Sequence, residues 1–207
     1  MKTIRHLFWD FDGTLYQSYP KMLKSSMQAL SDMNLHFPQE EVLKLIKINV
    51  SYGLRVCAQR SGADADQLID RFYVHHHQEK DFPPFEGMED CLRTLHAAGV
   101  KHYLYTHRDM SAVRQLQQDG LWELFSDAVT KEDPFPRKPE PDALLALMAR
   151  NGLSPEECAM VGDRDVDIEA GRNAGMRGIL FDPEGYYPGC SCDLQIDSLA
   201  QLPEKLL

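Results

Sequence analysis

The sequence lacks the features that mark several common classes of protein. It has no internal repeat and no low-complexity tract, and its 207 residues include only 5 cysteines. A sparse, odd number of cysteines does not make a disulfide scaffold, so we expect a reducing, cytoplasmic environment. The residues before Asp10 contain no long apolar run, so we expect neither a signal peptide nor a membrane-spanning helix there.

Excess positive charge is also absent. The 22 Lys and Arg residues are outnumbered by 32 Asp and Glu residues, which gives a formal net charge of −10. A molecule of this charge repels nucleic acids and anionic membrane surfaces, so we expect neither as a partner. An anionic substrate would meet the same repulsion unless local cations offset it. We expect a monomer or a homodimer.

The most informative segment is the mostly apolar run at 6–15, which contains two acids. Its apolar residues predict a strand buried on both faces, and Gly13 predicts the turn that ends it. Asp10 and Asp12 therefore lie at a strand tip beside buried surface. Two carboxylates in such a place are costly unless a cation or hydrogen bonds hold them. Taken alone, the segment also fits an Asx-type turn after a strand.

The rest of the chain shows two different patterns of apolar residues. Apolar residues recur at helical spacing throughout 20–80, whereas strands and helices alternate from Gly87 onward. Further strands are expected at 100–106, 159–161 and 176–181, and helices at 88–98, 111–119, 141–150 and 166–174. Alternating strands and helices predict a parallel sheet with right-handed crossovers.

The helical block at 20–80 is too long for an ordinary connection between two strands. One interpretation is that its helices cover a face of the sheet, but an inserted domain fits the length better. We therefore predict a doubly wound, Rossmann-like α/β core with an inserted all-helical cap. The expected boundaries are 1–15 and 86–207 for the core and 16–85 for the cap.

Three more motifs occur later in the chain, two at the ends of expected strands and one before an expected helix. The strand at 100–106 ends at Thr106, and Lys138 stands just before a helix in the pattern Lys-Pro-x-Pro-Asp. Asp163 and Asp167 follow the next strand in the pattern Gly-Asp-x-x-x-Asp. Because the carboxyl ends of parallel strands meet at one edge of the sheet, where such folds bind their ligands, we expect Asp10, Thr106 and Asp163 to lie together.

In this order, the four motifs resemble those of the haloacid dehalogenase-like superfamily, in its phosphatase branch with a helical cap, the branch that includes phosphoglycolate phosphatases. The resemblance spans almost the whole chain. It implies an Mg²⁺-dependent phosphatase that hydrolyses small phosphorylated metabolites, of the phosphoglycolate or sugar phosphate type, through an aspartyl-phosphate intermediate. Gln17 stands where the family often has an acid, which leaves the subfamily open.

The resemblance also implies roles for the motif residues in phosphoryl transfer. Asp10 corresponds to the nucleophile, and Asp12 to the general acid and base that protonates the leaving alcohol and later accepts a proton from water. Thr106 and the backbone N–H of His107 would bind phosphoryl oxygens. Lys138 would neutralise charge on the transferring group.

The same resemblance implies an Mg²⁺ site, and oxygen ligands of this kind suit that ion. Asp163 and Asp10 are the expected carboxylate ligands, joined by the backbone carbonyl of Asp12. Asp167 is expected either as a ligand through water or as a brace on Lys138.

In the cap, the segment 47–55 is the most plausible counterpart of the loop that chooses substrates in this family. Tyr52 and Arg55 stand in what reads as a break between helical stretches. The planar guanidinium of Arg55 suits a substrate carboxylate or a second phosphate, although an ordinary surface arginine is an equally good interpretation.

Other functions share parts of this pattern. A phosphosugar mutase of the same superfamily would share every core motif. A halide-releasing dehalogenase lacks the second acid that Asp12 supplies. A receiver-like phosphoacceptor signalling protein is shorter, carries no helical insert, and places its acidic pair before the acceptor, whereas Asp163 and Asp167 follow it here. A catalytically silent interaction protein would have no use for the complete set of motif residues.

Overall fold

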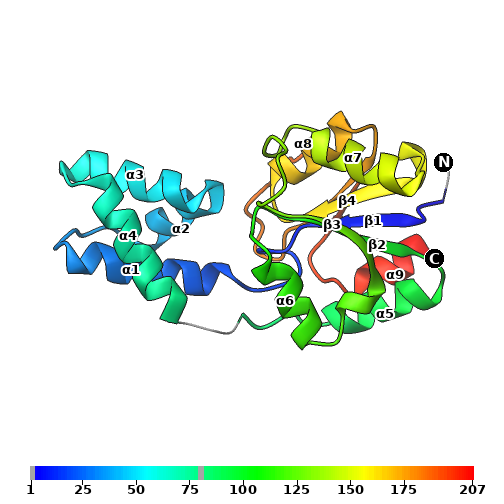
Figure 1. The fold of residues 1–207 in the computed structure, drawn as a ribbon, viewed down its shortest axis with the longest axis horizontal. Helices are drawn as coiled ribbons and strands as arrows, with labels where there is room; N and C mark the ends of the chain where they lie inside the picture. The colour runs from blue at the N-terminus through cyan, green and yellow to red at the C-terminus, as the bar shows by residue number, and fades with distance from the viewer. Residues whose placement is uncertain (1–2, 79–81) are drawn as a thin grey trace. The chain divides into compact units, whose positions relative to one another are not determined.

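The computed structural model describes residues 3–78 and 82–207 (Figure 1). The chain divides into two compact units. The first is formed by residues up to 16 together with those from 84 onward, and the second by residues 17–83. Within the described part of the chain, no helix is both long and apolar enough to cross a membrane.

Among the described residues, six parallel strands form the sheet of the first unit, in the order β3-β2-β1-β4-β5-β6. The strands are β1 His6–Trp9, β2 Lys101–Tyr105, β3 Phe125–Val129, β4 Cys158–Gly162, β5 Arg177–Phe181 and β6 Leu194–Ile196. The order runs outward in both directions from β1, which is the arrangement of a doubly wound fold. The reversal of order beside β1 places the ends of β1, β2 and β4 next to one another.

Helices cover both faces of this sheet. They are α5 Met88–Ala97, α6 Ser111–Gln118, α7 Asp142–Asn151, α8 Asp165–Asn173 and α9 Gln201–Leu206, with single 3-10 turns at Trp122–Leu124 and Pro155–Glu157. In Figure 1, α7 and α8 lie over one face, and α5 and α9 lie over the other. Because both faces are covered, consecutive residues of the central strand are buried: Leu7, Phe8 and Trp9 have no exposed surface.

The second unit consists of helices in its described part: α1 Tyr19–Asp32, α2 Gln39–Ile48, α3 Val50–Ser61 and α4 Ala65–Gln78. It has an apolar core of its own, which includes Leu30, Ile46, Leu54 and Leu68. A close approach between two of its helices depends on Gly53, because a Cβ there would lie 2.9 Å from the backbone carbon of Leu45.

These elements confirm the predicted doubly wound parallel sheet with an inserted helical segment. Two strands were missed. Strand β3 alternates poorly because Ser126 and Asp127 interrupt its apolar residues, and β6 has only 3 residues. Both are edge strands of the sheet, where residues are less buried and the sequence is therefore less apolar.

The break expected around 47–55 is much shorter than predicted. It is confined to Asn49, which has an extended backbone and caps α3 by accepting a hydrogen bond from the backbone N–H of Tyr52 at 3.0 Å. The prediction of a loop at Tyr52 and Arg55 is therefore wrong, since both residues belong to α3. The cause is the cap: Asn ends one helix and starts the next without an intervening loop.

Candidate active site

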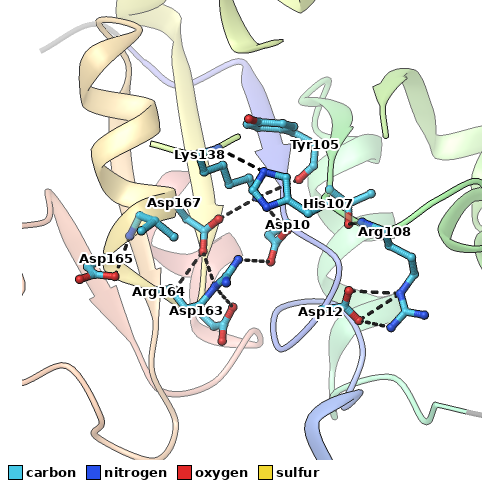
Figure 2. Close-up of polar contacts among 12 residues, drawn as sticks. Asp10, Asp12, Tyr105, His107, Arg108, Lys138, Asp163, Arg164, Asp165 and Asp167 are labelled. Carbon is cyan, nitrogen blue, oxygen red and sulfur yellow. Dashed lines mark hydrogen bonds and ion pairs between the residues drawn. The ribbon is translucent and has the colours of Figure 1, made fainter. Parts of the chain in front are cut away.

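Side chains from the ends of β1, β2 and β4 meet at one edge of the sheet (Figure 2). Asp10 directly follows β1, and its backbone N–H donates to the carbonyl of Val161 in β4 at 2.9 Å. This bond continues the ladder beyond the strand and holds the backbone of Asp10 in place. Thr106 and Asp163 directly follow β2 and β4 and are also buried.

Lys138 is the centre of this group, and its side chain is fully buried. Its Nζ donates to Oδ1 of Asp10 at 2.7 Å and to the carbonyl of Tyr105 at 3.0 Å, and it lies 2.7 Å from Oδ1 of Asp167. The ammonium also lies 4.5 Å from the centre of the Tyr105 ring. Burial alone would lower the pKa of Lys138, but the carboxylates of Asp10 and Asp167 raise it, so the lysine is a cation.

The ring of His107 positions the lysine rather than adding charge. Its Nε2 accepts a hydrogen bond from the backbone N–H of Lys138 at 3.1 Å. Burial, together with the positive charge of Lys138, lowers the pKa of His107 to about 3, so the ring is neutral at pH 7. Beside it, Oγ1 of Thr106 accepts a hydrogen bond from the backbone N–H of Arg108 at 3.0 Å. The hydroxyl proton of Thr106 can therefore be donated elsewhere.

Three buried carboxylates lie close enough together to hold a cation. Ligand atoms of Asp10, Asp163 and Asp167 lie within 4.8 Å of one another. Within the described chain, Oδ2 of Asp10 is buried and accepts no hydrogen bond. Burial raises the pKa of Asp10, and the charge of Asp167 adds to this effect although Lys138 and Arg164 oppose it. A cation would offset this cost, and oxygen ligands of this kind fit a divalent metal site.

Asp167 is held by protein groups at both of its oxygens. Oδ1 faces Lys138, and Oδ2 accepts a hydrogen bond from the backbone N–H of Arg164 at 3.2 Å. Burial alone would raise its pKa, but the charges of Lys138 and Arg164 lower it below the usual value. The bracing contact with Lys138 is thus the direct one in this structure.

Gly162 makes room for this arrangement. A Cβ at Gly162 would lie 2.2 Å from the Cβ of Asp167 and 2.4 Å from its carboxyl carbon, which no side chain can do. The glycine of the Gly-Asp-x-x-x-Asp motif is therefore required by the packing of the final acid of that motif against the end of β4.

Asp12 lies to one side of the cluster around Lys138 and faces Arg108 (Figure 2). Nε of Arg108 donates to both carboxylate oxygens of Asp12 at 3.1 Å, and Nη2 donates to Oδ1 at 2.5 Å. The predicted site residues of the first unit are thus brought together, with Asp12 at the margin.

Tyr52 and Arg55 belong to the second unit. Both are exposed, and Arg55 forms an ion pair with Asp66 at 2.8 Å. The substrate contacts predicted for Tyr52 and Arg55 stay a prediction.

Sequence reasoning missed three contributors: Tyr105, Arg108 and Arg164. Arg108 and Arg164 each lie within two residues of a recognised motif position, so adjacency to a motif was the signal available. Tyr105 was read only as part of a strand, since nothing in the sequence indicates that its carbonyl and ring receive a lysine. Arg164 lies 3.9 Å from Asp163 and 4.0 Å from Asp10.

Comparison with known proteins identifies the family of this chain. The family model described as haloacid dehalogenase-like hydrolase matches residues 7–181. The chain belongs to this family. The match spans the four motifs and the helical insertion, which confirms the resemblance drawn from Asp10, Thr106, Lys138 and Asp163.

Relatives of this hydrolase include a phosphoglycolate phosphatase of Vibrio vulnificus, which is 33% identical over 229 aligned positions that cover 99% of this chain and 96% of the relative. A pyrophosphatase of Oceanobacillus iheyensis is 28% identical, with 84% and 82% covered. The structure of a predicted phosphoglycolate phosphatase from Haemophilus somnus matches the fold with a TM-score of 0.85 at 21% identity, over 100% of both chains. Family and relatives indicate a phosphatase, which confirms that prediction.

Proposed function

We propose that this hydrolase is an Mg²⁺-dependent phosphatase that cleaves small phosphate monoesters, of the phosphoglycolate or sugar phosphate type, through an aspartyl-phosphate on Asp10. The observation that carries the proposal is the state of Asp10. One carboxylate oxygen is held by Lys138, while the other is buried beside Asp163 without a hydrogen bond in the described chain. A buried carboxylate with one oxygen held and one available is arranged to attack an electrophile.

In the first step, Oδ2 of Asp10 forms a bond to phosphorus while the bond from phosphorus to the ester oxygen breaks. Asp12 gives its proton to the departing oxygen, which leaves as an alcohol. In the second step, water attacks phosphorus, its proton goes to Asp12, and the bond to Asp10 breaks. The products are inorganic phosphate and the alcohol, with Asp10 again a carboxylate and Asp12 again protonated.

The other core residues stabilise the group in transfer. Lys138 supplies a buried positive charge next to the attacking carboxylate, where charge is worth more than in water. The hydroxyl of Thr106 and the backbone N–H of His107 would donate to phosphoryl oxygens. The neutral ring of His107 holds the backbone of Lys138 in place by accepting a hydrogen bond from its N–H.

The metal site would be built from the carboxylates of Asp10 and Asp163 and the backbone carbonyl of Asp12, with Asp167 bracing Lys138 and reaching the ion through water. When bound, Mg²⁺ would offset the negative charge of the phosphoryl group and of the acids around it. Two direct carboxylates and several waters are the usual protein share of an Mg²⁺ shell. The relatives named phosphoglycolate phosphatase support the substrate class.

We further propose a cytoplasmic location. All five cysteines are free thiols, which supports a reducing compartment. A phosphosugar mutase stays the alternative function, because it would use the same core residues. Conversion of a hexose 1-phosphate to its 6-phosphate without net phosphate release would favour the mutase.

Release of phosphate from 2-phosphoglycolate tests the proposal. Activity should require Mg²⁺, vanish with excess EDTA and return when Mg²⁺ is restored. Asp163→Asn should weaken Mg²⁺ binding because it removes an anionic ligand, whereas Asp165→Asn changes an exposed acid of the same turn and serves as the matched control. Full activity in excess EDTA would contradict the proposal.

A further inference from the structure

Both carboxylate oxygens of Asp12 are bound by Arg108 in this structure. The guanidinium donates to both carboxylate oxygens, at 3.1 Å from Nε to each and at 2.5 Å from Nη2 to Oδ1. This is a two-point, charge-assisted contact, the strongest class of side-chain hydrogen bond. We call this contact between Asp12 and Arg108 the clasp.

Arg108 is itself well positioned. Its backbone N–H is tied to Oγ1 of Thr106 at 3.0 Å, directly beside the expected phosphoryl site. Its guanidinium carbon lies 5.5 Å from the centre of the Phe11 ring, and Phe11 in turn stacks on Tyr16 at 4.5 Å between ring centres. Only 11% of the Arg108 side chain is exposed, so the cation is poorly solvated and depends on an anionic partner.

The clasp conflicts with the role proposed for Asp12. The carboxyl of Asp12 must reach the ester oxygen of the leaving group, yet both of its oxygens accept hydrogen bonds from Arg108. The clasp must therefore open during the reaction. Opening leaves a poorly solvated guanidinium without its carboxylate unless another anion takes that place.

We propose that Arg108 selects substrates whose leaving group carries a carboxylate, by transferring its two-point contact from Asp12 to that carboxylate. The exchange keeps Arg108 paired and releases Asp12 next to the ester oxygen. This inference rests on the proposed phosphatase function and names the leaving group that the function would take. It places part of the substrate discrimination in the core unit.

The geometry favours a short carboxylate. Arg108 already holds a carboxylate in its fork, so an incoming one needs no new arrangement of donors. In 2-phosphoglycolate, one methylene separates the ester oxygen from the carboxyl carbon, so both groups fall within the span of Asp12 and Arg108. Ethyl phosphate has the same backbone without the charge. It would open the clasp without replacing the lost contact.

The test compares these two substrates in wild-type enzyme, Arg108→Met and Arg108→Lys. Met keeps much of the length and apolar stem of Arg108 but removes the charge, and Lys restores the charge without the fork. Arg114→Met is the matched control, because Arg114 is an exposed arginine on the nearby helix α6. A second measurement records the Kd of 2-phosphoglycolate and of inorganic phosphate in the inactive Asp10→Asn background, with and without Arg108→Met.

Arg108→Met should lower kcat/KM for 2-phosphoglycolate on the order of 10- to 100-fold more than it lowers kcat/KM for ethyl phosphate, the range of a lost charge-assisted contact. Arg108→Lys should recover part of the loss. In the inactive background, the Kd of 2-phosphoglycolate should rise and that of inorganic phosphate should not.

Equal losses of kcat on both substrates with unchanged KM would overturn the inference, since Arg108 would then only position Asp12. An unchanged Kd for 2-phosphoglycolate would overturn it as well. Failure of the proposed function would look different: wild-type enzyme would release no phosphate from either substrate.

Discussion

A buried charge cluster in the first unit can be compared with an exposed ion pair in the second. In the first unit, Lys138 is fully buried between the carboxylates of Asp10 and Asp167. In the second unit, ion pairs such as Arg55 with Asp66 lie on the surface, where 56% and 80% of the two side chains are exposed. Exposed pairs contribute little to stability, whereas buried charges cost several kcal/mol in lost hydration.

The difference in burial indicates which charges serve the activity. A fold does not need a buried lysine between two acids, since well-packed apolar residues of the same volume are often as stable. The cluster around Lys138 is therefore best explained by chemistry. The surface pairs of the second unit carry no such implication.

Removal of Lys138 should have the largest effect. Lys138→Met leaves Asp10 and Asp167 buried without their cation, so it should abolish phosphatase activity and lower the free energy of unfolding by about 3–5 kcal/mol. Urea denaturation in EDTA measures the stability, because bound metal would mask part of the loss. Arg60→Met, which removes an exposed partner of Glu41, should change it by less than about 1 kcal/mol. Similar stability losses in the two variants would break the comparison.

Substitutions of two glycines, one in each unit, test the comparison further. Gly162→Ala pushes a Cβ into Asp167, so we expect activity to fall by about 100-fold, the loss typical of catalytic groups displaced by 1 Å. Gly53→Ala meets the backbone of Leu45 and should lower the stability of the second unit by about 1–3 kcal/mol, although Ala usually favours a helix. Kinetics and thermal unfolding separate the two outcomes. Unchanged kinetics in Gly162→Ala would show that the position of Asp167 is unimportant.

A buried histidine gives the first unit a pH dependence of stability. Nδ1 of His102 accepts from Trp9 at 3.0 Å, and Nε2 donates to the carbonyl of Leu92 at 3.1 Å, so both nitrogens are used by the neutral ring. Burial lowers the pKa of His102 to about 4. The unfolded chain, with a pKa near 6.5, binds the proton first as pH falls. Stability is therefore full above about pH 6.5 and is lost toward pH 4, by about 3 kcal/mol in all.

Urea unfolding at pH 7.5 and pH 5.5 is compared between the wild type and His102→Gln, because buried His107 also lowers stability over this range. The part of the loss due to His102 should be about 1 kcal/mol at the lower pH. His102→Gln should remove that part of the pH dependence. His36→Gln, which changes an exposed histidine of the second unit, should keep it. The account of His102 fails if the wild type and His102→Gln lose the same stability between the two pH values.

The smallest effect is expected at Arg55. Its guanidinium is already paired with Asp66, so Arg55→Ala should raise KM for 2-phosphoglycolate by less than about 5-fold, the scale of one exposed ion pair. Cleavage of an aryl phosphate should not change. Steady-state kinetics on both substrates decide, and an unchanged KM would assign Arg55 to the ordinary surface.

Much of the first unit could be predicted because its signals are local. Residues 7–9 form a continuous apolar run that ends in Asp10, and burial on both faces of the sheet produces such a run directly. Strand β3 could not be predicted, because its outer position lets Ser126 and Asp127 face solvent. Tyr52 was predicted to lie in a loop but lies in a helix, because the side chain of Asn49 caps that helix. The break between the two helices is therefore a single residue.

The site divides in the same way. Asp10, Thr106 and Asp163 were predictable because each directly follows a strand, and Lys138 was predictable from the resemblance of its Lys-Pro-x-Pro-Asp pattern to a family motif. The contacts that surround them were not, because they join residues far apart in the chain: Arg108 reaches Asp12 across 96 positions, and Lys138 reaches the carbonyl of Tyr105 across 33. The spacing of residues in the sequence does not indicate such long-range contacts.

The most direct test of the central claim is capture of the phosphorylated enzyme. The Asp12→Asn variant, mixed with an aryl phosphate and Mg²⁺ and quenched in acid, should carry a phosphoryl group on the peptide that contains Asp10, because an aryl leaving group departs without a proton while attack by water loses its base. Mass spectrometry of the digested protein identifies the site, and Asp10→Asn should carry none. Phosphatase activity in Asp10→Asn at the wild-type rate, or a phosphoryl group on another residue, would contradict the account.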